Sequence, residues 1–396
     1  MRDPDACARG LIAESALAAA GPGSPPGGFR TVETYVAVPS LSRPHLLLPT
    51  SPRPAARGLR RFSRGSGRAA RAAARAAAVG VRGGALTALR GSRFTLSVAP
   101  GLSDEQLPEI LLSRRLQQML GQADLNLAIR VGATRPNGKP VVQVMDRDGR
   151  AIAFVKIGWN DLTRPLVERE GEILQVFRDA GAPASFTTPT LVRRERWQGF
   201  ELLVVEPIGS GGLAAGPVAP LRPTCDVARM GGIRAGALGA STWWADAKQR
   251  LAGVDHPTLN DDMELIAERH GDRELAFGCA HGDWTPWNMI RAEGRLMVWD
   301  WERFRRDAPV GQDAIHYAFM VALRQRGQPA DEAARHALGA TPPLLSAMGA
   351  TPGDGPLLLL LHQLEMAIRF AEARQAGVTL RHDLFADQLH ALLAAG

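Results

Sequence analysis

Apolar and polar positions alternate along three short segments that follow Gly121. These segments read LNLAIRV, PVVQVMD and AIAFVKIG, and turns containing Gly and Asn separate them. Alternation with a period of two, bounded by such turns, predicts three antiparallel strands. Residues 163–180 instead repeat apolar positions at spacings of three and four, which predicts one helix. Two further strands are expected in PTLVRRERWQG and FELLVVEPI.

The rest of the chain changes character on either side of this strand-rich region. A Gly-rich stretch, residues 209–220, predicts a connector, and the pattern beyond it is mostly helical, including a buried helix over residues 357–373. Upstream, leucine spacing predicts a helix over residues 102–120, and residues 31–50 indicate one or two strands. We therefore expect four parts: a disordered segment 1–30, a basic Arg/Ala-rich extension 31–120 ending in a helix, a strand-rich lobe 121–208 and a helical lobe 209–396.

Charge is unevenly distributed along the chain, and the excess of positive charge lies in the extension. Residues 34–103 contain no Asp or Glu but carry twelve arginines, and without these the formal net charge of +7 would be −5. A basic segment of this kind binds nucleic acid or an anionic surface in some proteins. Aromatic residues for base stacking are nearly absent from residues 53–94, which contain only Phe62 and Phe94. We favour a solvated arginine-rich extension, with Gly67 to Ala78 as a helix.

Several classes of protein are disfavoured by composition. No apolar run reaches the roughly 20 residues that a membrane span needs, and the N-terminus lacks the apolar core of a secretory signal. The three cysteines are far apart and show neither zinc-site spacing nor a disulfide framework. A cytoplasmic location is the expectation.

Chemistry-bearing residues gather in the segments CAHGDWTPWNMI and VWDWE. Between Asn288 and Asp300 lies a short strand, an Ala-Glu-Gly turn and a second short strand, which predict a hairpin. A hairpin brings Asn288 and Asp300 to the same end, where their oxygens form the kind of cage that holds Mg²⁺ with substrate phosphates. Asp283 is then placed to orient an attacking hydroxyl, as phosphoryl transfer requires.

The pattern H-G-D-x-x-x-x-N, a hairpin and then D-x-E resembles the catalytic core of the aminoglycoside phosphotransferase and choline kinase superfamily. The resemblance implies a bilobal protein-kinase-like α+β fold, with an antiparallel sheet and one helix in the N-lobe and a mainly helical C-lobe. It implies that Asp283 is the catalytic base and that Asn288 and Asp300 bind Mg²⁺. It further implies that His281 braces the loop and that Asp313 supports the catalytic segment.

The same resemblance implies a lysine and glutamate pair in the upstream lobe. Lys156 lies in an otherwise apolar strand, where a charge needs a partner. Glu170 alone interrupts the apolar face of the next helix, so we assign it as that partner. Lys156 would then contact the α- and β-phosphates, and backbone groups from Glu206 to Ile208 would bind adenine.

Four of the eight tryptophans surround the candidate site: Trp284, Trp287, Trp299 and Trp301. They could stack on a sugar or an aromatic acceptor, but at this spacing packing is favoured.

The sequence therefore predicts a phosphotransferase that uses ATP, with GTP as an alternative, and Mg²⁺. The acceptor would be a hydroxyl of a small molecule such as a sugar, an aminosugar or an amino alcohol.

The rival hypothesis is a catalytically silent kinase-like protein that binds nucleic acid or another anionic partner through its basic segment. A protein kinase is disfavoured because no activation segment follows Asp300. A P-loop is excluded because Pro140 follows Lys139, where Ser or Thr would bind the metal.

Overall fold

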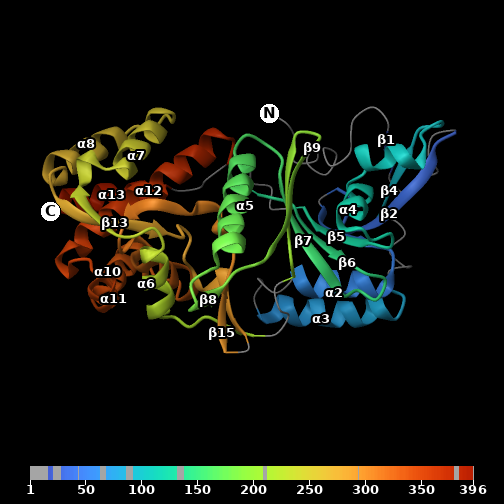
Figure 1. The fold of residues 1–396 in the computed structure, drawn as a ribbon, viewed down its shortest axis with the longest axis horizontal. Coiled ribbons are helices and arrows are strands. Elements are labelled where there is room, and N and C mark those ends of the chain that lie inside the picture. The colour runs from blue at the N-terminus through green and yellow to red at the C-terminus, as the bar shows by residue number, and fades with distance from the viewer. Residues whose placement is uncertain are drawn as a thin grey trace. The chain divides into compact units, whose positions relative to one another are not determined.

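The chain folds into an α+β structure that divides into two compact units (Figure 1). Unit 1 comprises Met1–Glu168 and Thr190–Pro207, and unit 2 comprises Arg169–Pro189 and Ile208–Gly396. The predicted fold class, with an antiparallel sheet and a mainly helical C-terminal region, is confirmed. The computed structural model describes residues 17–20, 28–42, 44–62, 68–85, 92–131, 138–207, 212–292, 294–378 and 383–395.

Within its described residues, unit 1 is built on a nine-stranded antiparallel sheet of order β1-β4-β2-β3-β5-β6-β7-β10-β9. The five strands predicted from alternation are present, because each places apolar residues on a covered face. The strands are β1 (Leu17–Ala20), β2 (Arg30–Pro39), β3 (Pro44–Pro49), β4 (Arg93–Val98), β5 (Asn126–Arg130), β6 (Val141–Met145), β7 (Ala151–Gly158), β9 (Leu191–Trp197) and β10 (Phe200–Val205).

Residues 31–120, which the sequence analysis separates as an extension, contribute three strands to this sheet. β3 pairs with β5 through Leu46 opposite Arg130 and Leu47 opposite Ile129. The sheet is therefore continuous across the predicted boundary at residue 120. Most of the predicted disordered segment 1–30 lies outside the described residues, although Leu17–Ala20 forms β1 against β4.

Helices cover both faces of the sheet in unit 1 (Figure 1). One face carries α2 (Pro52–Phe62) and α3 (Arg68–Arg82), which contribute Ala55, Ala56, Ala78 and Val81 to a small core. Gly58 is required on α2, because an added Cβ would lie 2.5 Å from the Ala128 Cβ. The helix approaches the strand too closely for any other residue.

The other face of the sheet carries η3 (Asp104–Glu109) and α4 (Leu112–Leu120). The single helix predicted over residues 102–120 is therefore wrong. Pro108 lies inside the first segment, which is a 3₁₀ helix, and the chain restarts as an α-helix after Leu111. Proline cannot donate the backbone hydrogen bond that a continuous α-helix needs at this point.

Two arginines of α2 contact an acidic or an aromatic side chain within unit 1. Arg53 pairs with Asp148 at 3.1 Å, and the Arg61 guanidinium lies 4.9 Å from the centre of the Phe154 ring. Arg57, Arg75 and Arg82 are exposed. The predicted helix over Gly67 to Ala78 is present as α3, in which Ala78 and Val81 are buried, whereas Ala72, Ala73, Ala76, Ala77 and Val79 are exposed.

Unit 2 is mainly helical and holds two small sheets of order β11-β14-β15-β8 and β12-β13-β16. Its strands are β8 (Phe186–Thr187), β11 (Leu213–Ala214), β12 (Arg234–Ala237), β13 (Glu274–Ala280), β14 (Met289–Ala292), β15 (Arg295–Val298) and β16 (Arg305–Pro309). Its helices are α6 (Leu221–Arg229), α7 (Thr242–Ala252), α8 (Leu259–His270), α9 (Gln312–Met320), α10 (Ala330–Ala340), α11 (Pro342–Met348), α12 (Gly355–Gln375) and α13 (Leu384–Ala395). Helix α5 (Thr163–Ala180) crosses from unit 1 into unit 2.

The central element of unit 2 is α12, the predicted buried helix, which is apolar on nearly every side. A helix of this kind is stable only when surrounded by other elements. It packs against α7, α8, α9 and α13 and carries buried His362 and Glu365 toward the loop after β13. Among the described residues, no helix is long and apolar enough to cross a membrane.

Candidate functional site

The H-G-D segment follows β13 directly and is held by the N-terminus of α9. Asp313 accepts hydrogen bonds from the backbone N–H of His281 at 2.7 Å and of Gly282 at 3.0 Å. Burial raises the pKa of Asp313, and the two N–H groups oppose that rise. Gly282 has φ +79°, and an added Cβ would lie 2.3 Å from the Arg303 carbonyl oxygen. Position 282 therefore requires glycine, and position 313 requires a side chain that accepts hydrogen bonds.

His281 is fully buried and bridges two parts of the loop. Its Nε2 lies 3.1 Å from the Trp299 carbonyl oxygen, and its Nδ1 accepts from the Asp283 backbone N–H at 3.2 Å. Burial lowers the pKa of His281, which favours the neutral ring with a proton on Nε2. These contacts give His281 the bracing position that the resemblance implies.

Asp283 has both carboxylate oxygens engaged. Oδ1 lies 3.1 Å from His316 Nε2, and Oδ2 accepts from the Asn288 amide at 2.8 Å. Burial raises the pKa of Asp283, but the hydrogen bond from His316 opposes this rise, and the net direction is downward. One third of the side chain is exposed, at 33%. An ionised, oriented and accessible carboxylate is suited to receive a hydrogen bond from an attacking hydroxyl.

The predicted hairpin is present and brings Asn288 and Asp300 to its open end. Met289 lies opposite Val298, and the Trp299 N–H donates to the Asn288 carbonyl oxygen at 3.1 Å. Asp300 adopts a left-handed conformation with φ 71°, which Asp tolerates better than most residues. The turn redirects the chain at this position into a short 3₁₀ segment, Trp301–Arg303.

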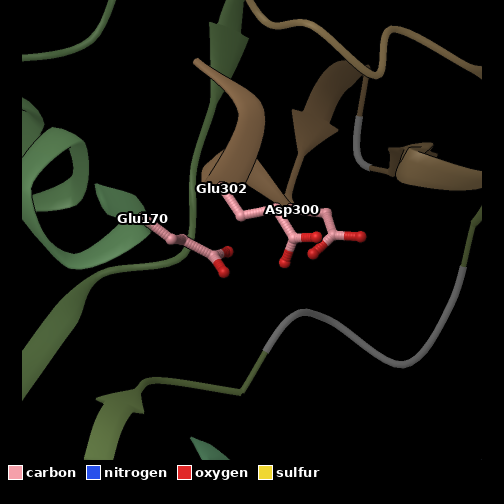
Figure 2. A group of neighbouring side chains, drawn as sticks. All are labelled: Glu170, Asp300 and Glu302. Carbon is pink, nitrogen blue, oxygen red and sulfur yellow. The ribbon is translucent and has the colours of Figure 1, made fainter. Parts of the chain in front are cut away.

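Three carboxylates converge at this end of the hairpin, from Glu170, Asp300 and Glu302 (Figure 2). Their oxygens all lie within 4.8 Å of one another. The Asn288 amide nitrogen is used on Asp283, so its Oδ1 is the atom that can bind a cation. Oxygen donors of this kind are the ligands that Mg²⁺ prefers, and the residues present fit such an ion.

The other predicted nucleotide-binding residues are placed as follows. Lys156 lies on β7 in unit 1, whereas Glu170 belongs to the part of α5 in unit 2. The predicted pair between them stays a prediction. The Glu206 backbone N–H donates to the Thr190 carbonyl oxygen at 2.9 Å, and the predicted contact of this segment with adenine stays a prediction. Ile208 and residues 132–137, between β5 and β6, lie outside the described residues.

Two residues at the loop, His316 and Arg369, were not singled out from the sequence. His316 reaches Asp283 from α9, and Arg369 on α12 donates to the Gly282 carbonyl oxygen at 2.7 Å. Arg369 also pairs with Glu365 at 2.6 Å, and Glu365 pairs with Arg250 at 2.9 Å. His316 follows Asp313 by three residues, one helical turn, which is the only signal that could have found it.

The ion pairs of Glu365 predict a specific loss of stability in acid. Burial opposes ionisation, but Arg369, Arg250 and Arg305 hold the pKa of Glu365 well below its ordinary value of 4.5. A depressed pKa means that the unfolded state binds the proton more tightly than the folded state does. The stabilisation by the ion pairs of Glu365 is therefore complete above a pH of 4.5, the ordinary pKa, and is lost as the pH falls below it. From pH 6 to 3, wild type should lose on the order of 2 kcal/mol more unfolding free energy than Glu365→Gln.

Urea unfolding at each pH measures this difference. Exposed Glu264→Gln on α8 is the matched control and should follow the wild-type pH dependence. Equal acid sensitivity of wild type and Glu365→Gln would show that the carboxylate is not stabilised by its arginines.

Comparisons with known proteins give matches to solved structures alone. No family model matches the chain, and no curated protein matches it. One similar structure is a thermostable mutant of aminoglycoside phosphotransferase APH(4)-Ia in a ternary complex with ADP and hygromycin B. It shows 14% identity, a TM-score of 0.47, and coverage of 72% of this chain and 98% of that chain.

Two further structures extend this set. The amicoumacin kinase hAmiN, in complex with AMP-PNP, Ca²⁺ and Ami, shows 15% identity, a TM-score of 0.40, and coverage of 65% of this chain and 84% of that chain. An ethanolamine kinase of Plasmodium vivax shows 13% identity, a TM-score of 0.37, and coverage of 65% and 78%. The structural neighbours are small-molecule kinases. This is the class of enzymes whose catalytic core the H-G-D pattern resembles.

Proposed function

We propose that this protein is a phosphotransferase that moves the γ-phosphoryl group of ATP, or alternatively GTP, to a hydroxyl of a small molecule. The observation that carries the proposal is the doubly held Asp283 carboxylate on the loop that also positions Asn288. The hairpin that begins after Asn288 ends at Asp300, where three carboxylates gather. Nucleophile orientation and phosphate neutralisation, the two requirements of phosphoryl transfer, are thereby supplied by one continuous segment.

In the proposed reaction Asp283 accepts a hydrogen bond from the acceptor hydroxyl and fixes one oxygen lone pair toward the γ-phosphorus. A bond forms between that oxygen and phosphorus, the bond from phosphorus to the β–γ bridging oxygen breaks, and the hydroxyl proton passes to Asp283. Asn288, Asp300 and the neighbouring glutamates would hold Mg²⁺, which when bound neutralises charge on the phosphates. Lys156 would contact the α- and β-phosphates.

The acceptor that we propose is a sugar, aminosugar, amino alcohol or related metabolite. The structural neighbours include an aminoglycoside phosphotransferase bound to hygromycin B and a glucosamine kinase bound to glucosamine, which supports a polyhydroxylated or amino-bearing acceptor. A catalytically silent protein would not need the oriented carboxylate at Asp283.

Calorimetric titration of ATP and GTP, with and without Mg²⁺, tests the nucleotide site. Wild type should bind at least one of them more tightly with Mg²⁺, and Asp300→Ala should reduce this gain by about 10- to 100-fold because a ligand is lost. The control is Asp331→Asn, an exposed residue on α10. A folded wild type that binds neither nucleotide would overturn the proposal and direct attention to the arginine-rich helices.

A further inference from the structure

A second histidine lies directly behind the one that contacts Asp283. His316 on α9 and His362 on α12 are both buried, with 4% of each residue's surface exposed. His316 Nε2 lies 3.1 Å from Asp283 Oδ1, and His316 Nδ1 lies 2.9 Å from His362 Nε2. A continuous chain of hydrogen bonds therefore runs from the candidate catalytic carboxylate through two imidazole rings into the core of unit 2.

The direction of these hydrogen bonds follows from the groups at the two ends. An ionised carboxylate only accepts, so His316 carries its proton on Nε2. In a neutral His316 ring, Nδ1 then accepts, and His362 must donate from its own Nε2. This leaves His362 Nδ1 without a proton, and that atom is buried without a hydrogen-bond partner in the described part of the chain.

A His316 ring protonated on both nitrogens is disfavoured because His362 Nδ1 is buried without a partner in the described part of the chain. If His316 were protonated on both nitrogens, His362 would accept on Nε2 and carry its proton on Nδ1, where a buried N–H would lack an acceptor. An unpaired buried donor of this kind is costly. Burial and the positive charge of Arg369 lower the pKa of His362 well below its ordinary value, so this ring does not take a second proton near neutral pH. The charged groups facing the pair are Asp283 and Asp313 on the His316 side and Glu365 and Arg369 on the His362 side.

We infer that His316 and His362 are positioning residues, in which a neutral His362 fixes the Nε2–H tautomer of His316 and thereby the orientation of Asp283. His316 restrains one carboxylate oxygen and Asn288 the other, so the carboxylate cannot rotate. A neutral His316 also leaves the negative charge on Asp283 undiminished. The catalytic consequence of this arrangement rests on the proposed function, but the tautomers do not.

Nitrogen-15 NMR of histidine-labelled full-length protein tests the tautomers without any assay of activity. The resonances of the two rings are assigned by their disappearance in His316→Gln and His362→Gln, among nine histidines in the chain. At pH 8 the single ring proton should lie on Nε2 in both rings. A His316 ring that is protonated on both nitrogens, or on Nδ1 alone, would overturn the inference.

Two substitutions at His362 separate positioning from packing. His362→Gln keeps an N–H that can donate to His316, whereas His362→Phe removes the donor but suits the aromatic neighbours Phe319 and Phe385, whose ring centres lie 5.3 and 6.4 Å away. The probe is Mg²⁺-ATP, with water as the acceptor. His362→Phe should lower kcat about 10- to 100-fold with little change in KM, whereas His362→Gln should retain most of the wild-type kcat.

The kinetic and the NMR measurements together distinguish failure of the inference from failure of the proposed function. If the pair only fills the core, Phe should preserve kcat and Gln should not, which would contradict the inference. In His362→Phe the His316 signals should show a mixture of both tautomers, and an unchanged Nε2–H form would also contradict it. A wild type that neither binds nor hydrolyses ATP would overturn the proposed function, while the NMR measurement would still decide the tautomers.

Discussion

Replacing Asp283 by asparagine should reduce phosphoryl transfer at least about 10³-fold while leaving nucleotide binding nearly unchanged, because general-base groups typically contribute 10²- to 10⁴-fold. The amide is nearly the same size as the carboxylate but can accept at one end only. Either His316 or Asn288 would then face an N–H₂ group with its own donor. The substitution therefore removes both the charge and the orientation of the group that receives the hydroxyl proton.

Initial rates of ADP formation from Mg²⁺-ATP measure this effect, with calorimetry to follow nucleotide affinity. Asp331→Asn, made on the exposed face of α10, provides the control for the same change of side chain. Loss of both turnover and affinity would indicate a structural role for Asp283. A variant that retains more than a tenth of the wild-type rate would exclude Asp283 as the base.

The local elements of this site were predictable because their signals lie within a few residues of one another. The turn between β14 and β15 and the apolar alternation on either side determine the hairpin, and the hairpin places Asn288 and Asp300 at the same end. Helix α5 was likewise predicted with both its ends, since Thr163 and Gly181 bound a regular apolar face. Backbone geometry alone carries these predictions.

The contacts that complete the site come from elements remote in sequence, and the pattern of a helix does not say which neighbour it will meet. Arg369 lies 87 residues after Gly282 but donates to its carbonyl oxygen. His362 interrupts the apolar series of α12 directly before Gln363, and its partner His316 is 46 residues away. Only the packing of α12 against α9 explains why a polar residue is retained there.

The arginine-rich region illustrates the same limit for a strand. Residues 31–50 were expected to form one or two strands, which are present as β2 and β3. Alternation indicates a strand but not its partner, and the pairing of β3 with β5 spans about eighty residues. Biased composition also drew attention to the charges of α2 and α3, whereas the small residues Ala55, Ala56 and Gly58 decide how α2 packs on the sheet.

Replacing Trp301 by alanine should cost about 3 to 5 kcal/mol of unfolding free energy, as expected for a large aromatic residue in a core. Trp301 is fully buried between the two acids of the D-x-E segment, so its ring points inward while Asp300 and Glu302 meet Glu170. The ring centre lies 4.5 Å from that of His281 and 4.8 Å from that of Phe177. Its indole N–H also donates to the Val298 carbonyl oxygen at 3.2 Å.

Urea unfolding followed by far-ultraviolet circular dichroism measures the cost, and Trp287→Ala is the matched control. Trp287 lies in the same loop region but is 42% exposed, so its removal should change stability by less than about 1 kcal/mol. Equal losses in the two variants would contradict a packing role specific to Trp301. Because Trp301 supports both His281 and the turn at Asp300, its loss should also weaken Mg²⁺-dependent nucleotide binding under conditions where the variant remains folded. Trp287→Ala should leave that binding intact, and a selective loss there instead would assign the exposed ring to ligand stacking.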